Sequence, residues 1–267
     1  MDTRAYSTWL EVDLSVIKNN IKQIKNMTGT RVMAIIKANG YGHGVLAVAE
    51  AAAQAGTSWL GVARIEEALN LRAAGIESEL MVLGYTPPVL IPEAIQNNIH
   101  VAIYDRDMAK DYVSFAKKVE GRLKAHLKIE TGMGRLGMAP EFVRNFLYAH
   151  KNHPTIDIAG IFTHFARADE PQAKSAAQQL GIFNDLLTQL REAKLCPPMV
   201  HAANSAAVLN FPEAYFDMVR PGIVIYGLDP SPETNIPETF KPALTWKARL
   251  TSVRTLPPGH GVSYGSI

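Results

Sequence analysis

Residues 32–44 read VMAIIKANGYGHG, in which an apolar run ends in a lysine and a glycine-rich turn. A short run that is apolar throughout is typical of a strand buried on both faces, as in a parallel sheet. Similar runs recur along the chain and alternate with segments of helical period. The sequence therefore predicts repeated βα units.

The number of these units indicates the fold class. Eight strands are predicted, at Val32–Lys37, Trp59–Ala63, Leu80–Leu83, Val101–Tyr104, Leu123–Ile129, Ile158–Thr163, Met199–Ala202 and Met218–Ile225. Helices are predicted between them at Val45–Gln54, Ile65–Ala74, Pro88–Gln96, Met108–Val119, Pro140–His150, Ala173–Ala193 and Ala206–Asn210, and a further helix, Leu14–Met27, precedes the first strand. This count favours an α/β protein built as a (β/α)8 TIM-type barrel.

The character of the sequence changes after Gly227, where residues 229–241 read DPSPETNIPETFK with no regular period. We therefore predict a barrel at residues 1–230, a linker at 231–241 and the start of a β-rich C-terminal domain at 242–267. That last region holds two predicted strands, Ala243–Thr255 and Gly261–Gly265, which are too few to bury a core. We expect a truncated domain, and so a fragment.

Composition excludes several classes of protein. The 267 residues carry 27 Lys and Arg against 25 Asp and Glu, a net charge of +2 with no basic run, which gives no footprint for nucleic acid or an anionic membrane. The single cysteine, Cys196, excludes an internal disulfide framework and a thiolate metal cluster. Charges near the N-terminus and the absence of a long apolar stretch lead us to expect a cytoplasmic protein with no membrane span. We also predict no metal site.

Reactive groups of a (β/α)8 barrel lie at the carboxyl ends of its strands. Lys37 closes the first predicted strand, so its amine would emerge from an apolar, desolvated stem as a nucleophile or base. The three glycines that follow within residues 40–44 allow a ligand to approach the backbone closely. A solvated lysine at the barrel rim is the alternative.

A phosphate cradle is predicted after the last two strands. The backbone amides of Gly222 and Ile223, with the hydroxyl of Ser205 at a helix start, lie where barrels commonly bind phosphate. The alternative is a pair of ordinary turns in which Ser205 serves as an N-cap.

Two further strand ends carry chemistry. Arg135 stands in the Gly-rich turn TGMGRLG after the fifth strand, and His164 follows the sixth. A lysine that can bond a carbonyl, a phosphate cradle, two arginines and a histidine at the rim together suggest pyridoxal phosphate, whose aldehyde, phosphate, phenolate and ring each need such a partner.

These segments resemble the bacterial alanine racemases, the barrel-type pyridoxal-phosphate enzymes. The resemblance rests on WLEVDL at residues 9–14, KANGYGHG at 37–44, HLKIETGMGRLG at 126–137, THFARAD at 163–169, HAANSAA at 201–207, VRPGIVIYG at 219–227 and GVSYG at 261–265. It covers essentially the whole chain. The function it implies is the interconversion of L- and D-alanine, which supplies D-alanine for peptidoglycan.

The resemblance also implies roles for individual residues. Lys37 would hold the cofactor covalently and act as one catalytic base. Arg135 would bond the phenolic oxygen, His164 would pack along the ring, and Arg220 would face the pyridine nitrogen. The phosphate would be held by Tyr41, Ser205, Gly222 and Ile223, with Asn204 beside it. In some family members the lysine at the position of Lys128 is carbamylated and holds the arginine at the position of Arg135.

Inverting a Cα centre needs proton removal on one face and delivery on the other, so racemisation needs two bases. The resemblance assigns the second base to Tyr264, which would reach into the site of the other subunit of a homodimer. Two alternatives stay open. One is a non-catalytic pyridoxal-phosphate homeostasis protein, which would not need Arg135, the linker or the VSYG segment. The other is a racemase of serine or another small amino acid.

Overall fold

The structure is a computed structural model that describes residues 5–170, 172, 174–234 and 236–266. Met1, Ala173 and Ile267, which bound segments predicted from the sequence, lie outside the described residues. The chain divides into two compact units, one of residues 13–243 and the other of residues 1–12 with 244–267.

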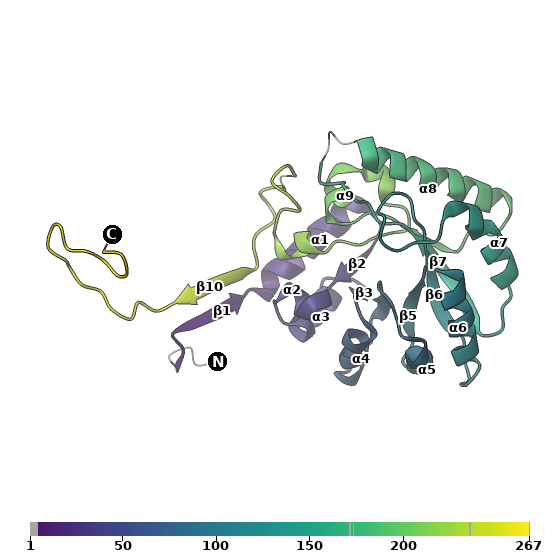
Figure 1. Cartoon of the computed structure of the whole chain (residues 1–267), viewed down its shortest axis with the longest axis horizontal. Helices are drawn as coiled ribbons and strands as arrows, with labels where there is room; N and C mark the ends of the chain where they lie inside the picture. Colours follow the sequence, from purple (N-terminus) through teal and green to yellow (C-terminus); the bar gives the residue numbers. More distant parts are fainter. Residues whose placement is uncertain (1–4, 171, 173, 235, 267) are drawn as a thin grey trace. The chain divides into compact units, whose positions relative to one another are not determined.

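The larger unit is built on an eight-stranded parallel sheet, and the predicted (β/α)8 barrel is confirmed (Figure 1). Its strands follow one another in the order β8-β7-β6-β5-β4-β3-β2-β9. Their bounds are β2 Arg31–Ile35, β3 Trp59–Val62, β4 Glu79–Val82, β5 Ile99–Ile103, β6 Leu123–Lys128, β7 Ile156–Phe162, β8 Met199–His201 and β9 Met218–Val219.

The barrel closes around β9, which is much shorter than the predicted strand Met218–Ile225. On one side β9 pairs with β2. On the other side Asp217 N donates to Val200 O at 3.0 Å and Arg220 N donates to Ala203 O at 2.8 Å. Pro221 has no N–H to continue the ladder. The chain turns there into a 3₁₀ helix, η4 (Ile223–Tyr226), so the prediction of strand beyond Val219 was wrong.

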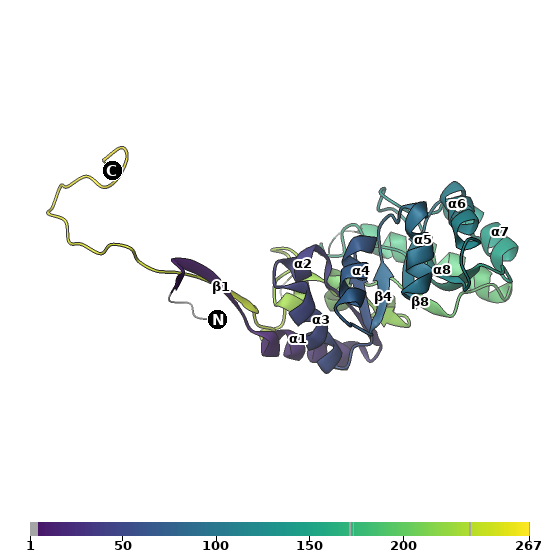
Figure 2. The same ribbon diagram turned by 90° about the horizontal axis from the view of Figure 1, so that it is seen from below.

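Helices cover the outside of the sheet, and α4, α5 and α6 follow one another around it (Figures 1 and 2). Asp13 caps α1 by accepting from Ser15 N at 2.8 Å, and Gly29 ends this helix in the left-handed conformation. No helix among the described residues is long and apolar enough to cross a membrane. The helices are α1 Leu14–Thr28, α2 Lys37–Tyr41, α3 Val45–Gln54, α4 Ile65–Ala73, α5 Ile91–Gln96, α6 Arg106–Ala116, α7 Pro140–His150, α8 Lys174–Glu192 and α9 Ser205–Asn210, with 3₁₀ turns η2 Pro88–Leu90 and η3 Pro212–Ala214.

Apolar side chains fill the barrel. Met33, Trp59, Met81, Phe162 and Met218 belong to one buried cluster. Because inward and outward positions alternate along a strand, each strand gives only every second side chain to this core. A polar residue at an inward position is therefore an exception to this pattern.

The smaller unit contains one antiparallel pair of strands, β1 (Thr8–Val12) and β10 (Leu244–Ala248), in which Leu10 lies opposite Trp246. The sequence did not predict β1, and β10 is shorter than the predicted strand Ala243–Thr255. Residues 261–265, predicted as a strand, form coil and a turn instead.

Candidate active site

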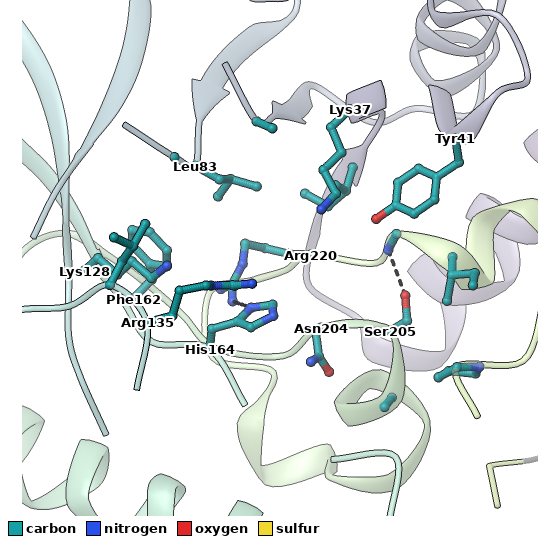
Figure 3. Close-up of a pocket in the computed structure, with 18 of the residues that line it drawn as sticks. Lys37, Tyr41, Leu83, Lys128, Arg135, Phe162, His164, Asn204, Ser205 and Arg220 are labelled. Atoms are coloured by element: carbon teal, nitrogen blue, oxygen red, sulfur yellow. Dashed lines mark hydrogen bonds between the residues drawn. The ribbon is translucent and has the colours of Figure 1, made fainter. Parts of the chain in front are cut away.

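A cavity of 470 Å³ opens at the carboxyl ends of the barrel strands, within the larger unit. This volume lies in the range of small-molecule sites. Figure 3 shows Lys37 and Tyr41 extending into it toward Ser205 and Arg220. Ten residues predicted from the sequence line it: Lys37, Tyr41, Lys128, Arg135, His164, Asn204, Ser205, Arg220, Gly222 and Ile223.

The backbone after Lys37 makes a left-handed turn. Ala38, Asn39, Gly40 and Tyr41 all have positive φ, between 51° and 62°. Left-handed geometry costs an L residue roughly 1 kcal/mol or more, so such a run persists only where its surroundings impose it. Lys37 begins this turn as an exposed residue, whereas the sequence predicted it at the end of a strand with a desolvated stem.

Two side chains hold the left-handed turn, the carboxylate of Glu67 and the carboxamide of Asn39. Glu67 on α4 accepts from Ala38 N at 2.6 Å through Oε1 and from Ala63 N at 2.8 Å through Oε2. Asn39 accepts from Val45 N at 3.0 Å, which joins the turn to the start of α3. Glu67 therefore ties the segment that carries Lys37 to the end of β3.

The residues of the predicted phosphate cradle lie together at the carboxyl end of β9. Ser205 Oγ accepts from Gly222 N at 2.8 Å, which leaves the hydroxyl proton of Ser205 free to donate elsewhere. A Cβ on Gly222 would lie 2.7 Å from the hydroxyl oxygen of Tyr41, so this hydroxyl approaches the backbone of residue 222 closely. The described residues supply no acceptor for the N–H of Ile223. The N-cap of α9 is Asn204, which accepts from Ala207 N, and not Ser205.

The loop that carries Arg135 is shaped by the carboxylate of Glu130. Its Oε1 accepts from Met133 N at 2.6 Å, and its Oε2 accepts from Gly134 N at 3.0 Å. Burial opposes ionisation, yet the backbone N–H groups outweigh it and lower the pKa of Glu130. A Cβ on Gly137 would lie 2.4 Å from Glu130 N, so only glycine allows the loop to return this closely. The exposed Arg135 is thus presented by an ordered loop.

Arg220 is buried beside the cavity and is held by two backbone carbonyls and a histidine nitrogen. Its Nη2 donates to Thr163 O at 2.7 Å and to Ala202 O at 2.9 Å, and its Nη1 lies 2.9 Å from Nδ1 of His201. Burial lowers its pKa to about 9, which leaves the guanidinium charged at neutral pH. These bonds use three of its five N–H groups, and the other two have no acceptor among the described residues.

His164 lies against Arg220, with its Nδ1 3.4 Å from Nη2. Burial and then the charge of Arg220 lower the pKa of His164 to about 3, with smaller contributions from Lys128, Arg135 and Lys37. The ring is therefore neutral, and it can lie against a flat aromatic ligand without adding charge.

Lys128 ends β6 and is 4% exposed, with its Nζ 5.7 Å from the centre of the Phe162 ring. Burial lowers its pKa to about 8, and the charges of Arg135 and Arg220 act in the same direction. Among the described residues no carboxylate pairs with its amine.

The family is shown by comparison with known proteins. The family model described as "Alanine racemase, N-terminal domain" matches residues 12–230, which include every cavity-lining residue discussed above. The chain belongs to the alanine racemase family. The resemblance carried by the sequence segments is thereby confirmed.

Relatives of the alanine racemase family extend beyond the matched domain. The chain is 40% identical to the alanine racemase of Symbiobacterium thermophilum over 259 residues, which is 97% of this chain and 69% of that protein. It is 41% identical over 261 residues to that of Desulforamulus reducens, covering 96% and 70%.

Solved alanine racemase structures share the fold. The enzyme from D-cycloserine-producing Streptomyces lavendulae gives a TM-score of 0.90 at 38% identity and covers 97% of this chain and 70% of that one. The enzyme from Bacillus anthracis with bound L-Ala-P gives 0.88 at 35% identity, with coverage of 97% and 68%.

One predicted site residue of this alanine racemase family member, Tyr264, belongs to the smaller unit, where it is 99% exposed. Its assignment as second base stays a prediction.

Sequence reasoning missed the residues that hold the site in place. Glu67 and Glu130 act through backbone amides and carry no signal of their own in the sequence. Three buried histidines, His100, His126 and His201, were also missed as a group. Their signal was visible: His100 and His126 are polar residues inside apolar strands, and such residues need partners.

Proposed function

We propose that this chain acts as an alanine racemase, which uses pyridoxal phosphate to interconvert L- and D-alanine and so supplies D-alanine for peptidoglycan. The observation that carries the proposal is the convergence, in one cavity, of Lys37 with the Tyr41–Ser205–Gly222 cradle and with Arg220. Each of these groups would meet a different part of the cofactor: Lys37 the aldehyde, the cradle the phosphate and Arg220 the pyridine nitrogen.

The charge of the cavity fits an anionic cofactor. Among the described residues, Lys37, Lys128, Arg135 and Arg220 line it, against one carboxylate, that of Asp169. Phosphate and a phenolate, together with the carboxylate of an amino-acid substrate, would balance this excess of positive charge. Arg135 would hold the phenolic oxygen, because the Glu130 loop presents it at the rim.

The cradle fits the phosphate group. The hydroxyls of Tyr41 and Ser205 and the N–H of Ile223 are donors without a described acceptor, and they lie around the bare backbone of Gly222. Asn204 starts the helix beside them. Three neutral donors suit a phosphate because they need no counter-charge of their own.

When bound, pyridoxal phosphate would withdraw electrons from the substrate and make its Cα hydrogen acidic. Lys37 would hold the cofactor and exchange a proton with Cα on one face. Tyr264 of a second copy of the chain would exchange a proton on the opposite face, which makes a homodimer part of the proposal. Arg220 would present N–H groups to the pyridine nitrogen and, as a permanent donor, disfavour protonation of that nitrogen. His164 would pack along the ring.

Two other functions make different predictions. A non-catalytic pyridoxal-phosphate homeostasis protein would bind the cofactor without acting on amino acids, yet the ordered presentation of Arg135 by Glu130 favours an enzyme. A racemase of serine or another small amino acid would share the cavity and differ in its preferred substrate.

The test is to load the purified chain with pyridoxal phosphate and to measure D-alanine formed from L-alanine. Loss of the Cα hydrogen in deuterated water is followed in parallel by NMR, because this exchange needs only Lys37. We expect exchange of alanine that exceeds exchange of serine and other small amino acids. Cofactor binding without any Cα exchange would support the binding protein, and equal rates for several amino acids would contradict alanine specificity.

A further inference from the structure

A line of polar side chains crosses the apolar interior of the barrel. It begins at Glu79, the first residue of β4, and passes His100 on β5, His126 on β6 and His201 at the end of β8 before it reaches Arg220. The strands of the barrel sheet are parallel, so Glu79 lies at the amino end of the barrel, while Arg220 lies at the carboxyl end, where the cavity opens. The line therefore connects the two ends of the barrel.

Every link in the line is within hydrogen-bonding distance. Glu79 Oε2 is 3.2 Å from His100 Nε2, and His100 Nδ1 is 3.1 Å from His126 Nε2. His126 Nδ1 is 2.8 Å from His201 Nε2, and His201 Nδ1 is 2.9 Å from Arg220 Nη1. Each ring uses both of its nitrogens. Among the described residues no group of three or more His, Cys, Asp or Glu could hold a metal ion, so the rings bind one another and not a common centre.

The two ends of the line determine its direction. A guanidinium can only donate, so His201 Nδ1 must accept and its proton must be on Nε2. That proton is donated to His126 Nδ1, and the same reasoning places a proton on Nε2 of His126 and then of His100. The last proton points at Glu79, whose carboxylate can only accept. One arrangement satisfies all four bonds: three neutral histidines, each protonated on Nε2.

An added proton disrupts this arrangement. If any one of the three rings carried two protons, two donors would face each other at that ring or further toward Arg220. The fold agrees, because burial lowers the pKa of His126 and His201 well below the ordinary value and that of His100 to about 4. His100 also faces the charges of Lys124 on β6 and Asp157 on β7, and Glu79 faces Arg72 on α4.

The surroundings make room for the rings and exclude water. The pairing of β6 and β7 shifts register between Ala125 and His126, and Gly160 then lies opposite His126. A Cβ on Gly160 would lie 2.4 Å from His126 Nδ1, the atom that accepts from His201. Trp59 packs edge-on against the His100 ring at 4.8 Å, and Phe162 stacks on the His201 ring at 4.8 Å.

We propose that Glu79, His100, His126 and His201 form one directed hydrogen-bond chain that orients Arg220 in the site, so that Glu79 is a positioning residue at the opposite end of the barrel. The proposal deepens the proposed function, because it concerns the arginine that would face the pyridine nitrogen. Hydrogen bonds in a chain polarise one another. Loss of the carboxylate at one end therefore loosens the guanidinium at the other.

The first test needs no variant and no cofactor. ¹⁵N NMR of the histidine side chains at neutral pH distinguishes the two neutral tautomers from the doubly protonated ring. We expect His100, His126 and His201 all to carry a single proton, on Nε2. A proton on Nδ1 of any of the three would overturn the proposal.

The second test removes the carboxylate. In Glu79→Leu the acceptor is lost, whereas Glu79→Gln keeps an acceptor oxygen without the charge. We expect Glu79→Leu to leave the Nε2–H of His100 without an acceptor, and so to shift the ¹⁵N signals of His100, His201 and the Arg220 guanidinium. We expect Glu79→Gln, which also serves if the leucine variant does not fold, to shift the same signals less. Glu77→Leu, an exposed carboxylate two residues away, is the matched control.

The loaded protein gives the functional readout. We expect Glu79→Leu to weaken pyridoxal-phosphate binding by about three- to tenfold, the scale of one hydrogen bond, with Glu77→Leu unchanged. Signals of His201 and Arg220 that do not respond to Glu79→Leu or Glu79→Gln would overturn the proposal. Because the NMR signature is read without cofactor, it stands apart from the proposed function: the expected tautomers in a protein that never binds pyridoxal phosphate would refute the racemase and leave the chain of hydrogen bonds intact.

Discussion

A methyl group on Gly222 would lie 2.7 Å from the hydroxyl oxygen of Tyr41. The two residues come from opposite ends of the barrel sequence, and their contact forms one wall of the proposed phosphate cradle. Because the obstructing atom is the far end of a side chain, Tyr41 can move aside without unfolding the barrel. The cradle would then lose one donor.

We therefore expect Gly222→Ala to fold normally and to bind pyridoxal phosphate about tenfold more weakly, the scale of one charge-assisted hydrogen bond. Equilibrium dialysis measures the affinity. Gly181→Ala is the control, because a Cβ there meets nothing within 4 Å on helix α8. It should leave binding unchanged and raise stability by up to about 1 kcal/mol through helix propensity. Equal affinity in the two variants would show that Gly222 is not part of the phosphate cradle.

Lys37 is expected to hold pyridoxal phosphate covalently. Borohydride should trap the cofactor on the peptide that contains Lys37, and the loaded protein should absorb at about 400 nm or above. Lys37→Arg keeps the charge but cannot form the bond, so both signals should disappear. Lys110→Arg, an exposed site on α6, should keep them. Trapping that persists in Lys37→Arg would show that another amine holds the cofactor.

Lys128 is expected to react with carbon dioxide. With a pKa of about 8, roughly half of its amine is neutral at pH 8, whereas an ordinary lysine amine is almost fully charged there. The neutral nitrogen bonds the carbon of CO₂ and releases a proton, which gives a carbamate anion that the charges of Arg135 and Arg220 would stabilise. ¹³C-bicarbonate should give a carbamate signal that grows from pH 7 to pH 8. The signal should be missing in Lys128→Met and present in Lys110→Met.

The buried histidines are expected to make the fold sensitive to acid. The pKa values of His100, His126, His164 and His201 are all lowered in the fold from the ordinary value of 6.5, so the unfolded chain binds more protons as the pH falls. Above pH 6.5 these histidines are neutral in both states and do not change the free energy of unfolding. Below pH 6.5, toward pH 4, the free energy of unfolding falls by about 1.4 kcal/mol per pH unit for each histidine that remains neutral in the fold. Urea titrations between pH 4 and 8 measure it, with the exposed His260→Asn as a control of unchanged slope.

Tyr264 is expected to act across subunits. In a chain extended at its C-terminus by the rest of a relative, Lys37→Ala and Tyr264→Phe should each lower racemisation by about two orders of magnitude or more, and the unextended chain should be weakened similarly. Mixing the two variants should restore activity, because one site of the mixed dimer combines Lys37 of one copy with Tyr264 of the other. A mixture that stays as inactive as its components would contradict the shared site.

The barrel could be predicted from the sequence because strands buried on both faces are apolar throughout, and this pattern is local. The last strand was predicted too long for a physical reason. Most of Met218–Ile225 is apolar, but Pro221 has no N–H to donate and Gly222 N donates to Ser205, so the regular strand ends at Val219 and the last backbone bonds to neighbouring strands are made by Arg220 and Pro221. The pairing of β1 with β10 was missed, because it joins segments more than 230 residues apart and no local pattern encodes it.

Some cavity-lining residues, such as Lys37, Arg135 and Ser205, could be predicted because they stand at or just after the ends of predicted strands, and the carboxyl ends of parallel strands meet. The places of Tyr41, Asn204 and Lys128 followed only from the family resemblance. The supporting groups could not be predicted. Glu67 and Glu130 bind backbone amides whose positions depend on the folded loops, and the link from His126 to His201 depends on the space left by Gly160. Such contacts are set by three-dimensional packing rather than by residue type.

The left-handed turn after Lys37 has a consequence for attempts to make the protein more stable. Ala38, Asn39 and Tyr41 have the left-handed backbone that D-amino acids prefer, which is strained for L-amino acids. Among the genetically encoded residues, only glycine adopts it without that strain. Ala38→Gly would therefore be selected by any screen for thermal resistance, while it would add motion to the segment that carries the lysine. At this turn, tolerance of heat and accurate placement of Lys37 are competing objectives, and a variant improved for one is expected to be poorer in the other.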